Sequence, residues 1–124
     1  MIQLNYRDAK PIYEQIKDGL MHLLVTKSIQ PDEKLPSVRE LASGLAINPN
    51  TIQRAYRELE SEGYIYTVPG KGSFAASSKE IIDARSQELF EAFDHTVKEL
   101  FLCGYGKKEL ETRMEKLEKG VKES

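Results

Sequence analysis

The sequence predicts an α+β fold that is mainly helical, with one small β-hairpin between helical segments. Apolar residues recur at helical spacing in five segments, whereas alternation with a period of two is confined to residues 64–68. A turn-forming run at residues 69–72 separates this strand from a second one at residues 73–76. Over residues 35–74 the order is therefore helix, turn, helix and hairpin. This is the order of a winged helix-turn-helix, and a tail of two helices follows it.

Two helices are predicted before the turn of the helix-turn-helix. The first begins at Pro11, because the missing N–H group of proline would be unpaired in a first helical turn anyway, and it runs to about Lys27. The second begins at Ser37, which forms an S-x-x-E capping box with Glu40. The residues expected to point inward are Ile12, Ile16, Leu20, Leu23 and Leu24 in the first helix, and Val38, Leu41, Ala42 and Leu45 in the second.

The third helix has a clear start and a clear stop. Asn48 is a favoured N-cap, Pro49 suits the first helical position, and Gly63 is a natural C-terminal stop. Its inward face is predicted to consist of Ile52, Ala55, Tyr56 and Leu59. This arrangement leaves the opposite face of the helix to polar side chains.

The tail differs from the rest of the chain, and we place a domain boundary after residue 78, giving domains at residues 1–78 and 79–124. Residues 79–103 are predicted to form one long helix, which ends at the run Gly104–Gly106, and a last helix follows. Two such helices cannot bury their apolar stripes against each other alone, so the pattern predicts a homodimer. The predicted dimerisation residues are Ile82, Leu89, Phe93, Val97, Leu100, Leu110, Met114 and Leu117.

The composition indicates a folded, soluble chain and offers little for catalysis. Of its 124 residues 40% are hydrophobic and 31% charged, and no apolar run approaches the ~20 residues that span a bilayer. Its first residues lack a signal-peptide core, so we expect a cytoplasmic protein without membrane contacts. The single cysteine, Cys103, excludes an internal disulfide and is expected to be buried. No residues have metal-site spacing, and His22 and His95 lack catalytic partners, so we expect no metal, no cofactor and no enzymatic activity.

The net charge gives no support for nucleic-acid binding. The chain carries a formal charge of −2. Residues 1–78 hold nine Lys and Arg against nine Asp and Glu, and residues 79–124 hold nine against eleven. DNA-binding domains are often basic, so a prediction of DNA binding has to rest on where the charges lie.

The outward face of the third helix carries the residue types that contact DNA. Arginine, asparagine and glutamine form the usual hydrogen bonds to base edges, and all three also bind phosphates. A helix that enters the major groove by its N-terminal end would place these residues on DNA and the later acidic residues away from it. The candidate contacts are Asn50, Gln53, Arg54 and Arg57, and the acidic residues are Glu58, Glu60 and Glu62.

Two further regions extend this candidate surface. Arg39 lies outward beside the cap of the second helix, and the helix N-termini at Ser37 and Asn48 present amides that favour phosphate. At the hairpin tip a glycine-flanked lysine can approach the minor groove and its phosphates. The tip residues are Gly70, Lys71 and Gly72.

Each of these residues also has a purely structural interpretation. Arg54 and Glu58 are an i, i+4 pair worth only ~0.3–0.5 kcal/mol, and Arg57 could pair with an acidic residue of the next turn. Ser37 and Asn48 are helix caps first, and Lys71 could be a solvated turn residue. The order of elements around the third helix favours the DNA-binding interpretation.

Several motifs resemble those of the GntR family of bacterial transcription regulators: PIYEQIKDGL, LPSVRELA, NPNTIQRAYRELESEGYI and GKGSF. The resemblance covers roughly residues 9–76, and the short helical tail and the NPNT helix start look most like the YtrA subfamily. It implies DNA contacts by Arg39, by Asn50, Thr51 and Gln53, and by the wing residues 70–72. Many members of the family carry Arg where this chain has Pro49 or Gln53, so base preference cannot be copied across.

The resemblance also implies assembly and a regulatory role. Members of the family bind inverted-repeat operators as homodimers, and the YtrA group typically represses neighbouring transporter operons. We therefore expect a dimeric repressor that binds double-stranded DNA at a palindromic operator. A small-molecule effector needs ~300 Å³ or more, which two helices per protomer can supply only at the dimer interface. The alternative is a protein–protein module whose winged helix no longer binds DNA, and the neutral N-terminal half motivates it.

Overall fold

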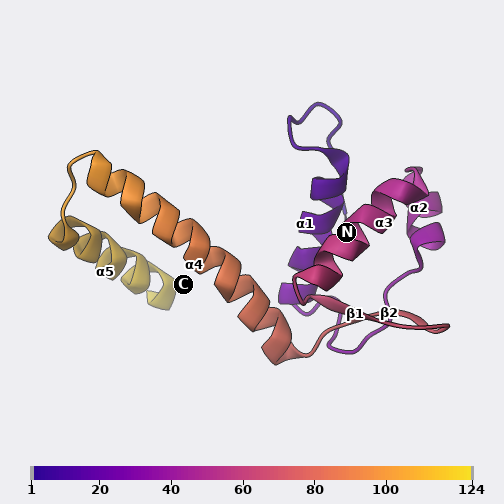
Figure 1. The fold of residues 1–124 in the computed structure, drawn as a ribbon. Coiled ribbons are helices and arrows are strands. Elements are labelled where there is room, and N and C mark those ends of the chain that lie inside the picture. The colour runs from indigo at the N-terminus through magenta and orange to yellow at the C-terminus, as the bar shows by residue number, and fades with distance from the viewer. Residues whose placement is uncertain (1, 124) are drawn as a thin grey trace. The chain divides into compact units, whose positions relative to one another are not determined.

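The computed structural model describes residues 2–123, and within this range it forms five α-helices and one antiparallel two-stranded sheet (Figure 1). The predicted fold class, mainly helical α+β with a winged helix-turn-helix, is confirmed, and the element bounds differ from the predicted ones by one or two residues. The elements are α1 (Ile12–Val25), α2 (Val38–Leu45), α3 (Pro49–Ser61), β1 (Ile65–Val68), β2 (Gly72–Ala75), α4 (Ser78–Leu102) and α5 (Lys107–Glu123).

The chain divides into two compact units, of which the first ends at Ser86 and the second begins at Gln87. The first contains α1, α2, α3, the hairpin and the first turns of α4, and the second contains the rest of α4 and α5. Helix α4 is continuous across this division. The domain boundary proposed after residue 78 falls at the start of α4 and stays a prediction.

The core of the first unit lies where α1, α2 and α3 pack together. All four residues of α3 that were expected to point inward are buried, as are Ile16, Leu20 and Leu24 of α1 and Ala42 of α2. The other residues expected to point inward, Ile12, Leu23, Val38, Leu41 and Leu45, are partly buried. Ile81, in the first turn of α4, is a core residue that was not predicted: it is 2% exposed, whereas Ile82, a predicted dimerisation residue, is 59% exposed.

The helix-turn-helix is held by the predicted caps. Ser37 Oγ accepts a hydrogen bond from the Glu40 amide at 3.1 Å, and Glu40 Oε1 accepts one from the Ser37 amide at 3.3 Å. Asn48 Oδ1 accepts a hydrogen bond from the Asn50 amide at 2.8 Å, and Pro49 is the first residue of α3. Helix α2 ends at Ala46, whose left-handed conformation (φ 56°) turns the chain toward α3. Capping of this kind typically stabilises a helix by ~1 kcal/mol.

Helix α3 ends within two residues of the predicted glycine. Gly63 has a φ of 91°, a conformation that costs side-chain-bearing residues energy. Its amide donates to the carbonyl oxygen of Glu60 at 3.1 Å, and the next amide, of Tyr64, donates to that of Leu59 at 2.9 Å. These two bonds are the Schellman pattern of a helix end. They direct Tyr64 into the core, where it is 0% exposed, and start β1.

A third segment, residues 32–35, pairs with the hairpin of β1 and β2. The Asp32 amide donates to the carbonyl oxygen of Ala75 at 2.9 Å, and the Leu35 amide donates to that of Ser73 at 2.8 Å. The wing is thus anchored on its β2 side by the connector between α1 and α2. The prolines of this connector gave no sign of the pairing, because hydrogen bonds between distant segments leave no local pattern in the sequence.

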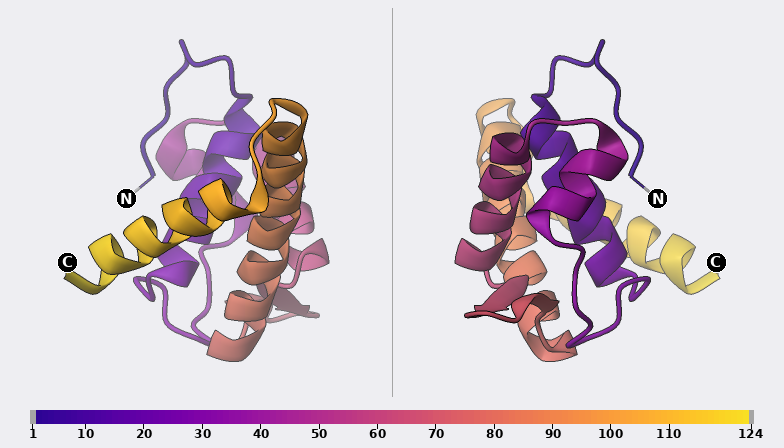
Figure 2. Two further views of the ribbon diagram at one scale, coloured as in Figure 1. Left: turned by 90° about the vertical axis from the view of Figure 1, so that its left-hand side faces the viewer. Right: turned by 90° about the vertical axis from the view of Figure 1, so that its right-hand side faces the viewer.

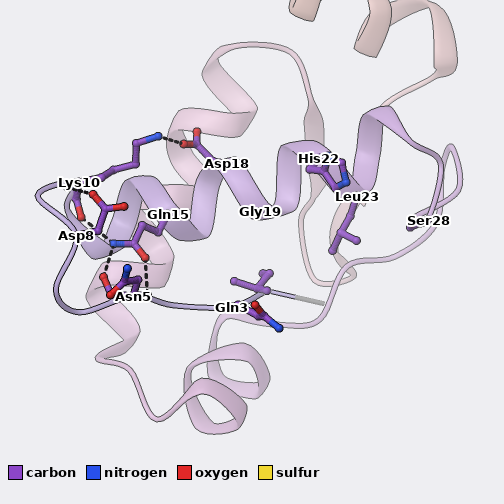
Figure 3. Close-up of a pocket in the computed structure, with 11 residues that line it drawn as sticks. Gln3, Asn5, Asp8, Lys10, Gln15, Asp18, Gly19, His22, Leu23 and Ser28 are labelled. Carbon is purple, nitrogen blue, oxygen red and sulfur yellow. Dashed lines mark hydrogen bonds and ion pairs between the residues drawn. The ribbon is translucent and has the colours of Figure 1, made fainter. Parts of the chain in front are cut away.

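The N-terminal segment also belongs to the first unit. It runs beside α1 and turns over the N-terminal end of this helix (Figure 2). Gln15 holds the turn: its Oε1 accepts from the Asn5 amide at 2.8 Å, and its Nε2 donates to the carbonyl oxygens of Asn5 and Lys10 at 2.9 and 2.8 Å (Figure 3). Ile2 packs on Gly19, where an added Cβ would lie 3.0 Å from the Ile2 side chain.

The second unit presents much of its apolar surface to solvent. The predicted dimerisation residues Leu89, Phe93, Met114 and Leu117 are 46–62% exposed. Val97, Leu100 and Leu110 are half-buried. The expectation for Cys103 is wrong: its thiol is exposed, because α4 ends at Leu102 and the chain turns away there. None of the described helices is both long enough and apolar enough to cross a membrane.

Candidate nucleic-acid interface

The exposed face of α3 is formed by polar and basic side chains. A helix advances by 100° per residue, so Asn50, Gln53, Arg54 and Arg57 lie opposite the four buried residues of this helix. All four are exposed, whereas Thr51 is half-buried. Together they offer amide and guanidinium groups, which can form hydrogen bonds with base edges and phosphates. The structure thus brings the four predicted residues of α3 to one surface.

The N-terminus of α2 is fixed to α3 by a tyrosine. Tyr56 is 4% exposed, and its hydroxyl donates a 2.7 Å hydrogen bond to the carbonyl oxygen of Pro36. Burial, assisted by the negative charge of Glu40, raises the pKa of Tyr56 to about 12. This bond holds the start of α2 against α3, and both Ser37 and the exposed Arg39 lie at that start.

The wing tip has the geometry that its glycines predict. Gly70 and Gly72 have φ values of 76° and 119°, and Lys71 between them is exposed. Lys34, which was not predicted to belong to the candidate surface, lies close to the tip. Its Cε would lie 3.0 Å from a Cβ added at Gly72. A second exposed lysine therefore lies beside the wing tip. Its only sequence signal is a basic residue directly before Leu35.

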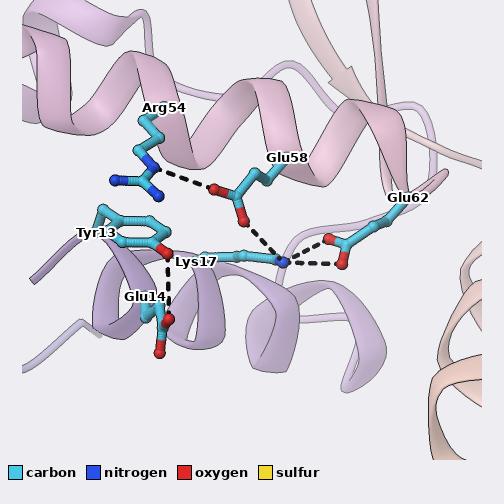
Figure 4. A network of polar contacts seen from close by, with 6 residues as sticks. All are labelled: Tyr13, Glu14, Lys17, Arg54, Glu58 and Glu62. Carbon is cyan, nitrogen blue, oxygen red and sulfur yellow. Dashed lines mark hydrogen bonds and ion pairs between the residues drawn. The ribbon is translucent and has the colours of Figure 1, made fainter. Parts of the chain in front are cut away.

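A charged network joins α3 to α1 (Figure 4). The guanidinium carbon of Arg54 lies 3.6 Å from the ring centre of Tyr13, and Arg54 Nε lies 3.3 Å from Glu58 Oε2. Lys17 Nζ lies 3.3 Å from Glu58 Oε1 and 2.7 Å from Glu62 Oε2. The pair of Arg54 and Glu58 was expected from their spacing. Tyr13 and Lys17 were not, because they belong to a helix far away in sequence.

The network also explains where the acidic half of α3 is directed. Glu58 and Glu62 both face Lys17, whose side chain is 17% exposed. Burial by itself would lower the pKa of Lys17, but hydrogen bonds and charge from Glu62 and Glu58 outweigh it and raise this pKa. Lys17 therefore offsets part of the negative charge of these two carboxylates. Arg57 forms no ion pair with residues of the described chain, so the alternative pairing with an acidic residue of the next turn is not seen.

Other parts of the first unit show no comparable site. A wide hollow of about 590 Å³ lies between the N-terminal segment and α1 (Figure 3). Two of its charged side chains, Lys10 and Asp18, pair with each other at 2.6 Å. Among residues 2–123 no cluster of His, Cys, Asp and Glu could hold a metal ion. The exposed surface of α3, with Arg39 and the wing tip, remains the candidate site.

Comparisons with known proteins identify the family of this chain. The family described as bacterial regulatory proteins, gntR family, matches residues 12–74. The HTH-type transcriptional repressor YtrA of Bacillus subtilis is 34% identical over 125 residues, which cover 99% of this chain and 91% of that protein. An uncharacterised HTH-type regulator of the same organism, YhcF, is 45% identical over 101 residues, covering 78% of this chain and 84% of that protein.

Two solved structures extend the comparison. A GntR family transcriptional regulator from Listeria monocytogenes is 36% identical and superposes with a TM-score of 0.71, covering 90% of this chain and 98% of that one. The DNA-binding domain of AraR, in a crystal structure with its operator ORR3, is 32% identical with a TM-score of 0.54. That match covers 60% of this chain and 89% of the AraR domain. All these relatives are named as regulators or, for AraR, as a DNA-binding domain, and none as an enzyme.

Proposed function

This chain belongs to the GntR family of bacterial regulatory proteins and is YtrA-like, and we propose that it is a repressor that binds an inverted-repeat operator as a homodimer. The observation that carries the proposal is the exposed face of α3, with two arginines and two amides on a helix whose other face is buried. Relatives of this chain are transcription regulators rather than enzymes. As such a regulator the protein acts in the cytoplasm, where bacterial DNA lies.

DNA recognition is assigned to three parts of the first unit. Helix α3 enters the major groove, where its four exposed polar residues contact base edges and phosphates. Arg39 and the N-terminal amides near Ser37 and Asn48 bind flanking phosphates, with Thr51 at the start of α3. Lys71 and its flanking glycines reach the minor groove. The AraR domain, which was crystallised on its operator, supports this arrangement by its 32% identity and shared fold.

The homodimer is assigned to the second unit. Exposed apolar side chains follow both α4 and α5, and a second copy would remove them from water. An apolar groove of about 310 Å³ lies between the two helices, lined by Phe93, Val97, Met114 and Leu117 among others. This volume is at the lower limit for small-molecule sites. If the protein has an effector, we place it at this groove in the dimer interface.

The test is selection of a DNA duplex from a randomised library, followed by titration of the enriched duplex. We expect a palindromic sequence, one dimer bound per duplex, and an affinity that falls steeply with salt as phosphate counterions are released. Sedimentation equilibrium of the free protein should give twice the monomer mass of 14.1 kDa. The proposal fails if no sequence is enriched at low salt. Recovery of a stable complex with a different protein would then favour the protein–protein alternative.

A further inference from the structure

Arg54 is held on the surface of α3 by a side chain from another helix. We propose that Tyr13 is a positioning residue for DNA binding, and that its ring holds the guanidinium of Arg54 in the orientation in which Arg54 contacts DNA. This inference rests on the proposed function. It assigns to α1, which has no predicted DNA contact, a role in preparing the recognition surface.

The geometry of the stack supports positioning. The guanidinium carbon of Arg54 lies 3.6 Å from the centre of the Tyr13 ring, well within the ~6 Å range of cation–π attraction. Figure 4 shows the guanidinium lying over the face of the ring, with Tyr13 at the start of α1 and Arg54 on α3. A planar guanidinium stacks on aromatic faces, whereas a lysine ammonium does not. The contact therefore depends on the shape of the Arg54 head group as well as on its charge.

The second contact of Arg54 keeps its terminal nitrogens for another partner. Glu58 Oε2 lies 3.3 Å from Arg54 Nε, the guanidinium nitrogen nearest the main chain. Arginine has five N–H donors, and four of them are on the two terminal nitrogens. In Figure 4 one of these terminal nitrogens lies on the side away from Glu58. The guanidinium is thus held by Tyr13 at its flat face and by Glu58 at Nε. Its terminal nitrogens remain available for DNA.

Lys17 completes this arrangement by sharing the carboxylate of Glu58. Glu58 Oε1 faces Lys17 Nζ at 3.3 Å, and the other carboxylate oxygen faces Arg54. Lys17 also lies 2.7 Å from Glu62. Because Glu58 is shared with Lys17, the carboxylate holds Arg54 in place but neutralises its charge only in part. The side chain of Arg54 is 56% exposed, so it remains accessible.

Ordering Arg54 before DNA arrives has a physical advantage. A free arginine side chain loses much rotamer freedom when it binds a phosphate or a base, and this loss weakens binding. The stack on Tyr13 imposes part of that order in the free protein. Arg57 is the natural comparison, because it lies on the same exposed face but has no ring contact or ion pair with the described residues. Tyr13 should therefore affect Arg54 and not Arg57.

A double-mutant cycle on the duplex enriched by the wild-type protein tests this inference. Tyr13→Leu removes the ring, and we expect it to weaken binding about three-fold, the effect of an exposed cation–π contact. In an Arg54→Ala background the same change should have no further effect, whereas in an Arg57→Ala background the full loss should remain. Tyr13→Phe keeps the ring face and should bind within two-fold of wild type. Arg54→Lys keeps the charge but loses the stack, and should weaken binding despite normal folding.

The contrary outcomes are distinct. Equal effects of Tyr13→Leu in the Arg54→Ala and Arg57→Ala backgrounds would mean that Tyr13 only supports the packing of α1 on α3, and would overturn the inference. Full affinity of Arg54→Lys would overturn it as well, and this variant does not disturb the half-buried Tyr13. The salt dependence of affinity tests the DNA contact of Arg54 separately from its positioning by Tyr13. If Arg54 contacts a phosphate, Arg54→Ala should lower the slope of log affinity against log salt by about one. Failure of the wild-type protein to enrich any duplex would instead reject the proposed function.

Discussion

The hydroxyl of Tyr56 donates a 2.7 Å hydrogen bond to the carbonyl oxygen of Pro36, and this bond joins the middle of α3 to the residue before the N-cap of α2. The two helices of the motif are therefore connected by a specific polar contact as well as by apolar packing. Because Tyr56 is buried, its hydroxyl needs such a partner. The geometry between Arg39 and the exposed face of α3 depends on this contact.

We expect Tyr56→Phe to lower the free energy of unfolding by about 1 kcal/mol, the usual contribution of one hydrogen bond. Urea unfolding followed by circular dichroism would measure it. Tyr66→Phe removes a hydroxyl that donates to Asp32 at 2.9 Å on the exposed wing, and it should cost less. If the two variants lost the same stability, the buried hydrogen bond of Tyr56 would contribute no more than the exposed one of Tyr66, and the prediction would be wrong.

The same tyrosine predicts a pH dependence. Its pKa is raised from 10.0 to about 12, so the folded state retains the phenolic proton more firmly than the unfolded chain does. The stability that this proton contributes is fully present below about pH 10 and is lost as the pH rises through about 12. The difference in unfolding free energy between wild type and Tyr56→Phe should therefore shrink across this window. Titration of tyrosinate absorbance should show a step near pH 12 that is missing in Tyr56→Phe.

The capping box of α2 predicts a loss of about 1 kcal/mol for Ser37→Ala, because the Glu40 amide would lose its acceptor. Ser43→Ala is the matched control, since Ser43 is exposed within the same helix and alanine is the better helix former. Thermal unfolding should show Ser37→Ala melting at a lower temperature and Ser43→Ala unchanged or slightly higher. Equal melting temperatures would show that the cap contributes nothing.

The wing glycines predict a graded series of stabilities. Gly70→Ala places alanine at a φ of 76°, near the left-handed helical region, and should cost about 1 kcal/mol. Gly72→Ala should cost more, because a φ of 119° lies outside that region. Gly44→Ala, in helix α2 with open space around it, should instead stabilise by about 0.5–1 kcal/mol. Chemical denaturation would rank the three variants.

The proposed dimer predicts that Leu117→Glu dissociates the protein. Leu117 is 62% exposed in the described chain, so a charge there should not unfold α5, but burying it in an interface would be costly. Sedimentation equilibrium should give a monomer, and affinity for a two-site duplex should fall. Lys119→Glu places a glutamate on the opposite side of α5, with an even larger change in charge, and should remain dimeric. A dimeric Leu117→Glu variant would place the interface elsewhere.

The local features of the fold could be predicted from the sequence, because each depends on residues a few positions apart. The capping box at Ser37, the start of α3 at Asn48 and the stop at Gly63 are examples. The exposed face of α3 followed from the same helical spacing. Which of its residues contact DNA stays a prediction.

Features that depend on distant residues could not be predicted in this way. Lys17 pairs with residues 41 and 45 positions later, and Tyr13 meets Arg54 across two helices. Ile81 was missed because a helical stripe can be drawn through either of two adjacent isoleucines, and only packing decides between them. No local pattern in the chain indicates how α1 lies against α3.

The balance of charges between α1 and α3 has a consequence for how such a protein searches a chromosome. Lys17 and Arg54 carry two positive charges, and the two carboxylates they face carry two negative ones. Under the proposed function, the attraction toward DNA of any sequence then comes from few side chains, chiefly Arg39, Arg57, Lys71 and Lys34. Weak attraction of this kind limits how many copies are sequestered by the vast excess of other sequences. A small number of molecules per cell could then keep a single operator occupied.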